Sequence, residues 1–464
     1  MKRRTFISKV AASGAALTVP KLAAGVPGKA ESSRGKATAM PAAEAGQKPL
    51  TISTPSFRLA LDSALPRIGK WSLEEIHSRF KKELAEDAIG FWETYGIDKQ
   101  YGAYLRPDKK DKKYPNTDKD LYSQGRILWL FSSFYNDFGR KKSHLDAAKQ
   151  GYQALLKNCR QPGDHWGTLY TRDWKMKEGI LDIYADIYMV LGLQEYYKAT
   201  GDEEAKKLAI ATSYAANETV VAPHYQGPGH GPTYEPGIKR LGTWVHFLYP
   251  LTLFLSHSQE AGLERIARFC VRNILTRHWQ RDKGFAWECL DHQYQPFSDD
   301  YLSRWTEGQN YGPYQLSGWH SIQGAFKVML EALRVGSREM FLDGMEFGFQ
   351  TCRTHWTGEG MGGFQGFETP AEWKRGKGTL EPDAAIYDYL IFTMIAIEHT
   401  LSPEAVDWFE RIYAAVLKRP EGIFTGSLTL HEPRGVMLGT KILERMIARG
   451  GRASDFFMSR PARL

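Results

Sequence analysis

Residues 128–156 read LWLFSSFYNDFGRKKSHLDAAKQGYQALL, and this stretch decides the fold. An apolar segment ends in the turn Gly139-Arg140, and a second segment that mixes basic and apolar residues follows it. Apolar residues that recur at intervals of three and four positions are typical of helices that bury one face. The stretch therefore predicts a helical hairpin.

The same pattern recurs along the chain. Further hairpins turn at residues 201–202, 256–259, 336–337 and 402–403, at intervals of roughly 55–80 residues. A helix over Trp71–Phe91, opened by a Ser72/Glu75 capping box, and a C-terminal helix over Thr440–Ala448 close a sixth hairpin. These intervals are longer and less regular than the repeat of a solenoid. We therefore predict an all-α (α/α)6 barrel, a toroid of six hairpins.

Segments rich in glycine and aromatic residues separate the hairpins. They cover Gly163–Trp174, His224–Pro236, Gly284–Tyr301 and Gly358–Trp373. We expect short β pieces and long loops here, gathered at one rim of the barrel. Because the faces of sugars stack on aromatic rings, such a rim favours a carbohydrate-sized cleft.

Composition and charge exclude several classes of protein. The chain has 464 residues, 13% of them aromatic, which excludes disorder for its bulk. The length allows two or three domains, but a barrel uses it once, so we expect one catalytic domain over 61–464. Residues 1–36 hold eight basic side chains and one acid, which accounts for +7 of the net charge of +8 and leaves +1 for the rest. A nearly neutral body argues against nucleic-acid binding.

The N-terminal residues are typical of an export signal. Met1–Lys9 contains the pair Arg3-Arg4, a short apolar stretch spans Val10–Val19, and small residues follow at Ala23-Ala24. We expect a twin-arginine-type signal peptide over 1–30, a flexible linker over 31–60, and a periplasmic or secreted protein. No later segment reaches the ~18 uncharged residues of a spanning helix, so no membrane anchoring is expected after signal removal.

Known catalytic and metal motifs are missing from the sequence. There is no Walker loop, no Gly-x-Ser-x-Gly elbow and no His-Glu-x-x-His motif. The four cysteines are widely spaced, which does not suit a disulfide scaffold or a zinc site, and we expect buried free thiols.

Four stretches offer candidates for acid–base chemistry. Arg126 lies in the first turns of a helix, where it can bind an anionic or enediolate oxygen or pair with a surface acid. His246 opens an apolar helix, either as a core histidine or as a ligand. His320 and Gln323 share a helix face and can form a hydrogen bond that orients the imidazole. His431 lies just before the last helix.

Taken together, these stretches resemble the N-acylglucosamine 2-epimerase family, which includes cellobiose 2-epimerases and aldose–ketose isomerases. Tyr122-Ser-Gln-Gly-Arg126 with Trp129 is similar to the family's W-x-Q-[AG]-R-x-x-W signature. The resemblance runs from about residue 75 to 448. Its other elements are Tyr184–Asp202, the helix of His246, Trp287-Glu288 at the rim, Gly318–Gln323 and His431–Arg434.

The chain departs from the family at several positions. Gln323 stands where the family has a Glu that orients and supports the histidine, and Trp319 is inserted beside His320. The helix that supplies a second Glu is reduced to residues 381–386, with Ile386 at its end. Asp186 lies in the middle of the family's Tyr-x-x-Ala-Phe helix. With Gln323 as its partner, His320 should be less basic, and Gln323→Glu should shift the acid limb of the pH–rate profile.

The resemblance implies exchange of the C2 proton of an open-chain sugar or reducing-end sugar, without metal or cofactor. It implies catalytic roles for His320 and His431 as the acid–base pair, with Arg126 on the enediolate and His246 on neighbouring hydroxyls or ring opening. Substrate binding is implied for Tyr122, Gln124, Asp186, Glu288, Trp319, Gln323 and Arg434. The expected partner is a small sugar or oligosaccharide, and a homodimer stays open.

Two other functions stay open. Exported polysaccharide lyases and unsaturated-uronide hydrolases also use (α/α)6 scaffolds, and paired carboxylates such as Asp186 and Glu288 would then carry the chemistry. Alternatively, Gln323 and Ile386 suit a sugar-binding protein that has lost its activity.

Overall fold

Each predicted hairpin is a pair of helices in the computed structural model. The structure describes residues 59–61, 63–108, 111–178, 182–225, 237–298, 316–357, 363–367, 370–376, 378–380, 385–418 and 430–458. The five hairpins are α3 (Leu121–Asp137) with α4 (Lys142–Cys159), α5 (Ile183–Thr200) with α6 (Glu203–Val221), α7 (Leu241–Leu255) with α8 (Ala261–Arg272), α10 (Gly318–Val335) with α11 (Arg338–His355), and α13 (Ala385–Thr400) with α14 (Pro403–Leu417).

The sixth hairpin joins the two ends of the helical unit. Helix α1 (Leu73–Glu83) packs against α15 (His431–Ala448) and continues through a π-helical segment, η1 (Leu84–Gly90), into α2 (Phe91–Tyr95). The Ser72/Glu75 capping box is present, with both of its hydrogen bonds. Helix α15 begins at His431 rather than near Thr440, so the predicted start of the last helix was wrong by nine residues.

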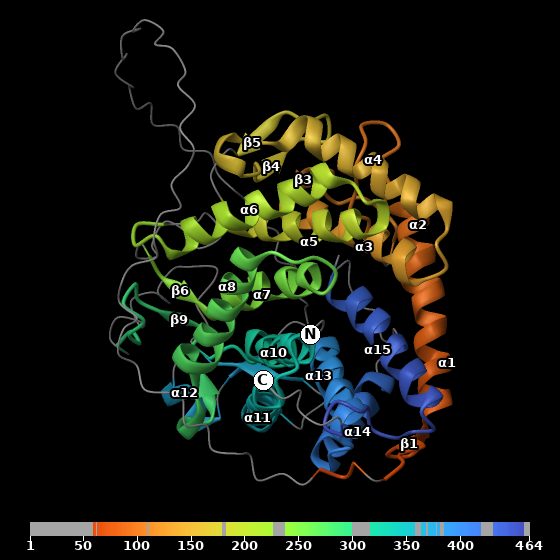
Figure 1. Ribbon diagram of the computed structural model, residues 1–464, viewed down its shortest axis with the longest axis vertical. Coiled ribbons are helices and arrows are strands. Elements are labelled where there is room, and N and C mark those ends of the chain that lie inside the picture. The colour runs from red at the N-terminus through yellow and green to blue at the C-terminus, as the bar shows by residue number, and fades with distance from the viewer. Residues whose placement is uncertain are drawn as a thin grey trace, which may run out of the picture. The chain divides into compact units, whose positions relative to one another are not determined.

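The inner helices form a closed ring (Figure 1). Each of α3, α5, α7, α10, α13 and α15 contacts the next along the chain. An ion pair of 2.7 Å from Lys441 on α15 to Asp137 on α3 closes the circle. All residues of α13 are buried, whereas α8 on the outside buries only one face. The expected (α/α)6 barrel is confirmed, and residues 54–464 form one unit.

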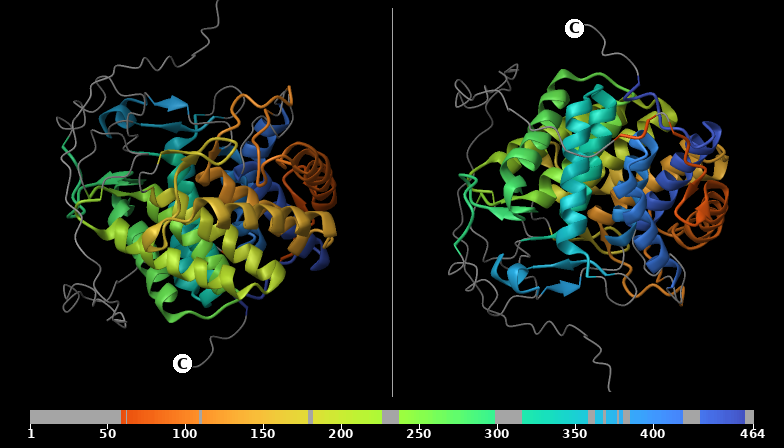
Figure 2. Two further views of the ribbon diagram at one scale, coloured as in Figure 1. Left: turned by 90° about the horizontal axis from the view of Figure 1, so that it is seen from above. Right: turned by 90° about the horizontal axis from the view of Figure 1, so that it is seen from below.

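Short strands sit between the hairpins. They are β1 (Arg67–Ile68) with β2 (Trp71–Ser72), β3 (Lys119–Asp120), β4 (Leu169–Tyr170) and β5 (Met176–Glu178) in one sheet, β6 (Lys239–Arg240) with β9 (Cys289–Leu290), β7 (Trp279–Gln280) with β8 (Phe285–Ala286), and β10 (Gln365–Gly366) with β11 (Thr379–Leu380). The remaining turns are η2 (Pro162–Asp164), η4 (Asn273–His278), η5 (Arg281–Lys283) and α12 (Pro370–Arg375). In the side views of Figure 2 the β10–β11 ribbon lies at one end of the inner helices.

The paired strands β3 and β6 fix the positions at which the inner helices α3 and α7 begin. β3 ends directly before α3, and Asp120 caps that helix by accepting a hydrogen bond of 2.8 Å from the Ser123 backbone N–H. β6 ends directly before α7, and its pairing with β9 brings Glu288 beside the start of α7. These short ribbons thus fix the helix ends that carry the candidate site.

Other expectations have mixed outcomes. The four cysteines are free and buried, as predicted. The signal peptide over 1–30 and nearly all of the linker over 31–60 lie outside the described residues. In the described part of the chain, no helix is both long and apolar enough to cross a membrane.

Candidate active site

Arg126 lies on the inner helix α3 and points toward α5. The two backbones come close at Gly125, where a Cβ atom would lie 2.3 Å from the Tyr188 carbonyl oxygen. The Arg126 guanidinium carbon consequently lies 3.7 Å from the Tyr122 ring centroid and 4.0 Å from that of Tyr188. Arg126 donates hydrogen bonds to both phenol oxygens. It is 2% exposed and its Nε has no partner, so a cationic donor is left over for a ligand.

His320 forms the first of two carboxylate–imidazole pairs, the Glu288–His320 pair. Its Nδ1 lies 2.8 Å from Glu288 Oε2. A Cβ atom on Gly242 of α7 would lie 2.7 Å from the imidazole, so only glycine lets His320 pack there. Glu288 also accepts a hydrogen bond of 3.3 Å from Arg240 Nε. Although burial raises the pKa of Glu288, His320 and Arg240 hold it below its ordinary value.

This pair corrects the role expected for Gln323. An ionised carboxylate only accepts hydrogen bonds, so Nδ1–H of His320 donates to Glu288 and Nε2 keeps the lone pair that can accept a proton. The Gln323 Oε1 instead accepts a hydrogen bond of 2.8 Å from Lys327 Nζ. The expectation that His320 depends on Gln323 was therefore wrong, because a carboxylate from the rim takes that place.

His431 forms the second pair, the Asp388–His431 pair. Its Nδ1 lies 2.9 Å from Asp388 Oδ2. The same carboxylate accepts hydrogen bonds from Trp319 Nε1, at 2.7 Å, and from Arg434 Nη2. The Trp319 ring lies 4.7 Å from the His431 ring, between centroids. Helices α10, α13 and α15 thus meet at one carboxylate.

Burial sets the ionisation of this second pair. It lowers the pKa of His431 to about 3, more than Asp388 raises it. Burial alone would raise the pKa of Asp388, but Arg434 and His431 hold it well below its usual range. His431 is therefore a neutral imidazole beside an ionised carboxylate. Sequence reasoning missed Asp388, and the signal available was a single acid in the otherwise apolar run 385–397.

His246 joins the two pairs to Arg126. Its ring centroid lies 5.3 Å from that of His320 and 5.7 Å from those of Tyr184 and Tyr188. Burial holds its pKa well below the ordinary value, and Lys327, His320, Arg126 and His431 lower it further. Nδ1 of His246 is buried without a partner. The side chains that act on the pKa of His246 therefore lie on three other inner helices, α3, α10 and α15.

These side chains make up the central cluster of the barrel. Its members are Arg126, His246, Glu288, Trp319, His320, Lys327, Asp388, His431 and Arg434. His320, His431 and Arg126, which are far apart in the sequence, therefore surround a common centre. No three His, Cys, Asp or Glu side chains among the described residues are arranged to hold a metal ion.

Two of the predicted substrate-binding residues, Gln124 and Asp186, form hydrogen bonds with other parts of the protein. Gln124 exchanges two hydrogen bonds, of 3.0 and 3.1 Å, with the backbone of Tyr104. Asp186 accepts hydrogen bonds from His165 Nδ1, at 2.7 Å, and from the Trp166 backbone N–H, at 2.9 Å. Both side chains bind the loops beside the inner helices, and these hydrogen bonds join neither of them to the central cluster.

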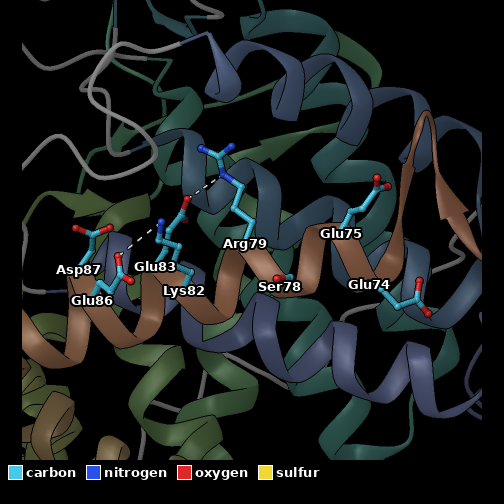
Figure 3. A pocket seen from close by; sticks show the side chains of 8 residues that line it. All are labelled: Glu74, Glu75, Ser78, Arg79, Lys82, Glu83, Glu86 and Asp87. Atoms are coloured by element: carbon cyan, nitrogen blue, oxygen red, sulfur yellow. Dashed lines mark hydrogen bonds and ion pairs between the residues drawn. The ribbon is translucent and has the colours of Figure 1, made fainter.

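A hollow of about 850 Å³ lies elsewhere, along α1 and η1 (Figure 3). Its lining is charged and includes the ion pairs Arg79–Glu83 and Lys82–Glu86. It contains no residue of the central cluster, so it is not the candidate active site.

Comparison with known sequences supports the resemblance. A family model described as N-acylglucosamine 2-epimerase matches residues 102–322. A cellobiose 2-epimerase from Ruminococcus albus is 31% identical over 140 residues, which cover 28% of this chain and 34% of that protein. The alignment thus spans about a third of the length of the curated relatives that it matches.

Comparison with solved structures extends the likeness to most of the chain. The cellobiose 2-epimerase from Bacillus thermoamylovorans B4167 has a TM-score of 0.65 at 16% identity, covering 80% of this chain and 100% of that chain. A D-mannose isomerase has a TM-score of 0.66 at 13% identity, covering 83% and 100%. At such identities the likeness establishes the shared fold.

Proposed function

Because the chain belongs to the N-acylglucosamine 2-epimerase family, we propose that it is a sugar epimerase or isomerase that exchanges the proton at C2 of an open-chain sugar. The observation that carries the proposal is the meeting of two carboxylate-bound imidazoles with a buried guanidinium at one centre. This arrangement supplies two proton carriers and one site for negative charge, which C2 proton exchange requires.

His431 is the base in one direction of the reaction. Its neutral imidazole accepts the C2 proton, and the C–H electron pair forms the C1–C2 double bond of an enediolate while the carbonyl oxygen takes the charge. An ionised carboxylate stabilises a neighbouring imidazolium, so Asp388 holds the proton on His431 until it is returned. General acid–base catalysis of this kind contributes ~10²–10⁴ in rate.

Arg126 stabilises the intermediate. Its guanidinium has an unpartnered Nε and no carboxylate partner among the described residues, so the enediolate oxygen meets a full positive charge in a buried site. His246, neutral and next to His320, contacts the adjacent hydroxyls or assists ring opening.

The stereochemical outcome depends on how the proton returns. If His320 protonates C2 from the opposite face, the product is the C2 epimer. If His431 returns the same proton to C1, the product is the ketose. The Glu288–His320 pair and the Asp388–His431 pair approach from different helices, which favours epimerisation by two bases.

The test is solvent isotope exchange. Aldoses and reducing disaccharides incubated with the protein in deuterated water should gain deuterium at C2. A product formed without deuterium at C2 contradicts proton exchange. Cleavage with a change of ultraviolet absorbance would instead favour the lyase or uronide hydrolase.

A sugar-binding protein without activity is less well supported. That alternative rested on the loss of the family's Glu at Gln323 and near Ile386. Glu288 and Asp388 supply carboxylates to both imidazoles, so the acid–base pair is complete. Binding of sugars with no deuterium uptake by any of them would restore the alternative.

We also propose that the protein is exported through the twin-arginine route. The pair Arg3-Arg4 before an apolar stretch supports this proposal. Residues 1–60 fused to a reporter should carry it out of the cytoplasm, and replacing both arginines by lysine should stop the transfer. Transfer that survives the replacement contradicts the route.

A further inference from the structure

Two buried cations lie side by side in the central cluster. Lys327 Nζ lies 5.4 Å and Arg434 Cζ 5.2 Å from the Tyr249 ring centroid. Both also lie over Phe326, at 5.7 and 5.1 Å. Lys327 is 1% exposed and Arg434 0%, so solvent does not screen their repulsion.

The carboxylates in reach do not balance these charges. Asp388 pairs with Arg434 and His431. Glu288 is occupied by His320 and Arg240. Among the described residues, Lys327 has one hydrogen-bond partner, the neutral amide of Gln323. A buried ammonium without a carboxylate is costly, so the resting protein lacks a negative charge at this point.

The surplus arises on one face of α10. Gln323 brings no charge, and Lys327 one turn later adds a positive one. Burial holds the pKa of Lys327 well below its ordinary value; Arg434 and Arg126 act in the same direction, and Asp388 opposes them without reversing the shift. An enediolate supplies one negative charge only during turnover, and Arg126 already meets it.

Arg434, next to Lys327, also has N–H groups without a hydrogen-bond partner. Nε and Nη1 of Arg434 are buried without a hydrogen-bond partner. Buried donors of a guanidinium are satisfied in nearly all proteins, so each such exception requires an explanation. A ligand with two acceptor oxygens and one negative charge satisfies Arg434 and neutralises the surplus together.

We propose that the substrate is an acidic sugar, a hexuronate whose carboxylate binds Arg434 and Lys327. This inference rests on the proposed function, which it narrows to one substrate class. A monoanion fits this place best, because Asp388 is counted against Arg434 and Lys327 is left without a carboxylate, whereas Arg126, which also lacks one, is assigned to the enediolate.

The first experiment compares an acid with its neutral isostere on the wild-type protein. Glucuronate, galacturonate and mannuronate are titrated calorimetrically beside glucuronamide and glucose. A charge-assisted pair predicts that at least one uronate binds about ten- to a hundredfold more tightly than the neutral sugars. Equal binding of acid and amide, or no binding by any of the three uronates, overturns the inference.

Two variants locate the charge. Lys327→Met should remove the preference for the acid, and Lys119→Met should keep it, because Lys119 is an equally buried lysine paired with Asp98. Gln323→Glu places a carboxylate next to Lys327 and should weaken uronate binding if Lys327→Met does not fold. A preference that survives both cluster variants overturns the inference.

Two further measurements distinguish a free-anion site from a sugar-acid site, and a failure of this inference from a failure of the proposed function. Inorganic sulfate or chloride that raises the melting temperature as much as the uronate does would show a free-anion site and overturn the sugar-acid assignment. Deuterium uptake at C2 of glucose with no preference for uronates would contradict this inference and leave the proposed function intact. A uronate that binds tightly without any uptake would contradict the proposed function and leave the acidic ligand in place.

Discussion

The Glu288–His320 pair and the Asp388–His431 pair use the same two groups in different surroundings. The His320 side chain is 21% exposed and its carboxylate comes from a rim strand segment. The His431 side chain is 4% exposed, and its carboxylate lies inside α13 with a guanidinium and an indole around it. The difference shows how one barrel can hold one imidazole neutral in its interior while leaving another near solvent.

The largest expected effect tests whether both pairs carry protons. His320→Gln and His431→Gln should each lower interconversion of the C2 epimers by ~10²–10⁴, because each removes one acid–base group. Exchange rates are measured by NMR in deuterated water. His77→Gln, on the outer helix α1, serves as the control. Wild-type interconversion in either cluster variant would leave that pair without a catalytic role.

The next largest effect is a difference in unfolding free energy between variants of the two carboxylates. Asp388→Asn leaves Arg434 buried without a carboxylate, so it should cost ~3–5 kcal/mol of unfolding free energy. Glu288→Gln should cost less, because the Arg240 side chain is 18% exposed and water can solvate it. Urea unfolding gives both values. Equal losses would mean that the two pairs are not solvated differently.

Acidification should destabilise the protein through the buried pair. The pKa of His431 is lowered to about 3 in the folded protein, so between ~6.5 and ~3 only the unfolded chain binds a proton there. The unfolding free energy therefore decreases as the pH is lowered across this window, by at most ~1.4 kcal/mol per pH unit for one such group. His431→Gln should flatten the slope measured by urea unfolding from pH 7 to 5. An unchanged slope would mean that His431 is protonated in the fold.

The smallest expected effect is on kcat, when Trp319, whose indole contacts the Asp388–His431 pair, is replaced. Trp319→Phe removes the hydrogen bond to Asp388 and keeps the ring on His431, so kcat should fall about tenfold with little change in KM. Steady-state kinetics measures both. A raised KM with unchanged kcat would instead return Trp319 to the substrate-binding role expected from the sequence.

Much of the fold was predictable from local patterns. Helical periodicity, the Ser72/Glu75 box and polar turns such as residues 336–337 act within one hairpin, and the structure has them where expected. His431 was expected just before the last helix, whereas it is the first residue of α15, which carries Pro433 in its first turn.

The carboxylate partners were not predictable, because they come from distant parts of the chain. Glu288 reaches His320 through the β6–β9 pairing, and Asp388 reaches His431 through the packing of α13 on α15. The family model matches residues 102–322 and does not reach Asp388, and the resemblance that pointed to His431 did not point to its carboxylate. Asp186 was selected for its charge within a helix, and a hydrogen bond from His165 accounts for it.

The central claim is that two imidazoles act on opposite faces of C2, and isotope exchange in the single variants tests it most directly. Each C2 epimer of a substrate is incubated separately with His320→Gln and with His431→Gln in deuterated water. The account predicts that neither variant interconverts the epimers, and that each labels only one epimer, a different one for each variant. Loss of labelling from the same epimer in both variants, or interconversion by either one, contradicts it.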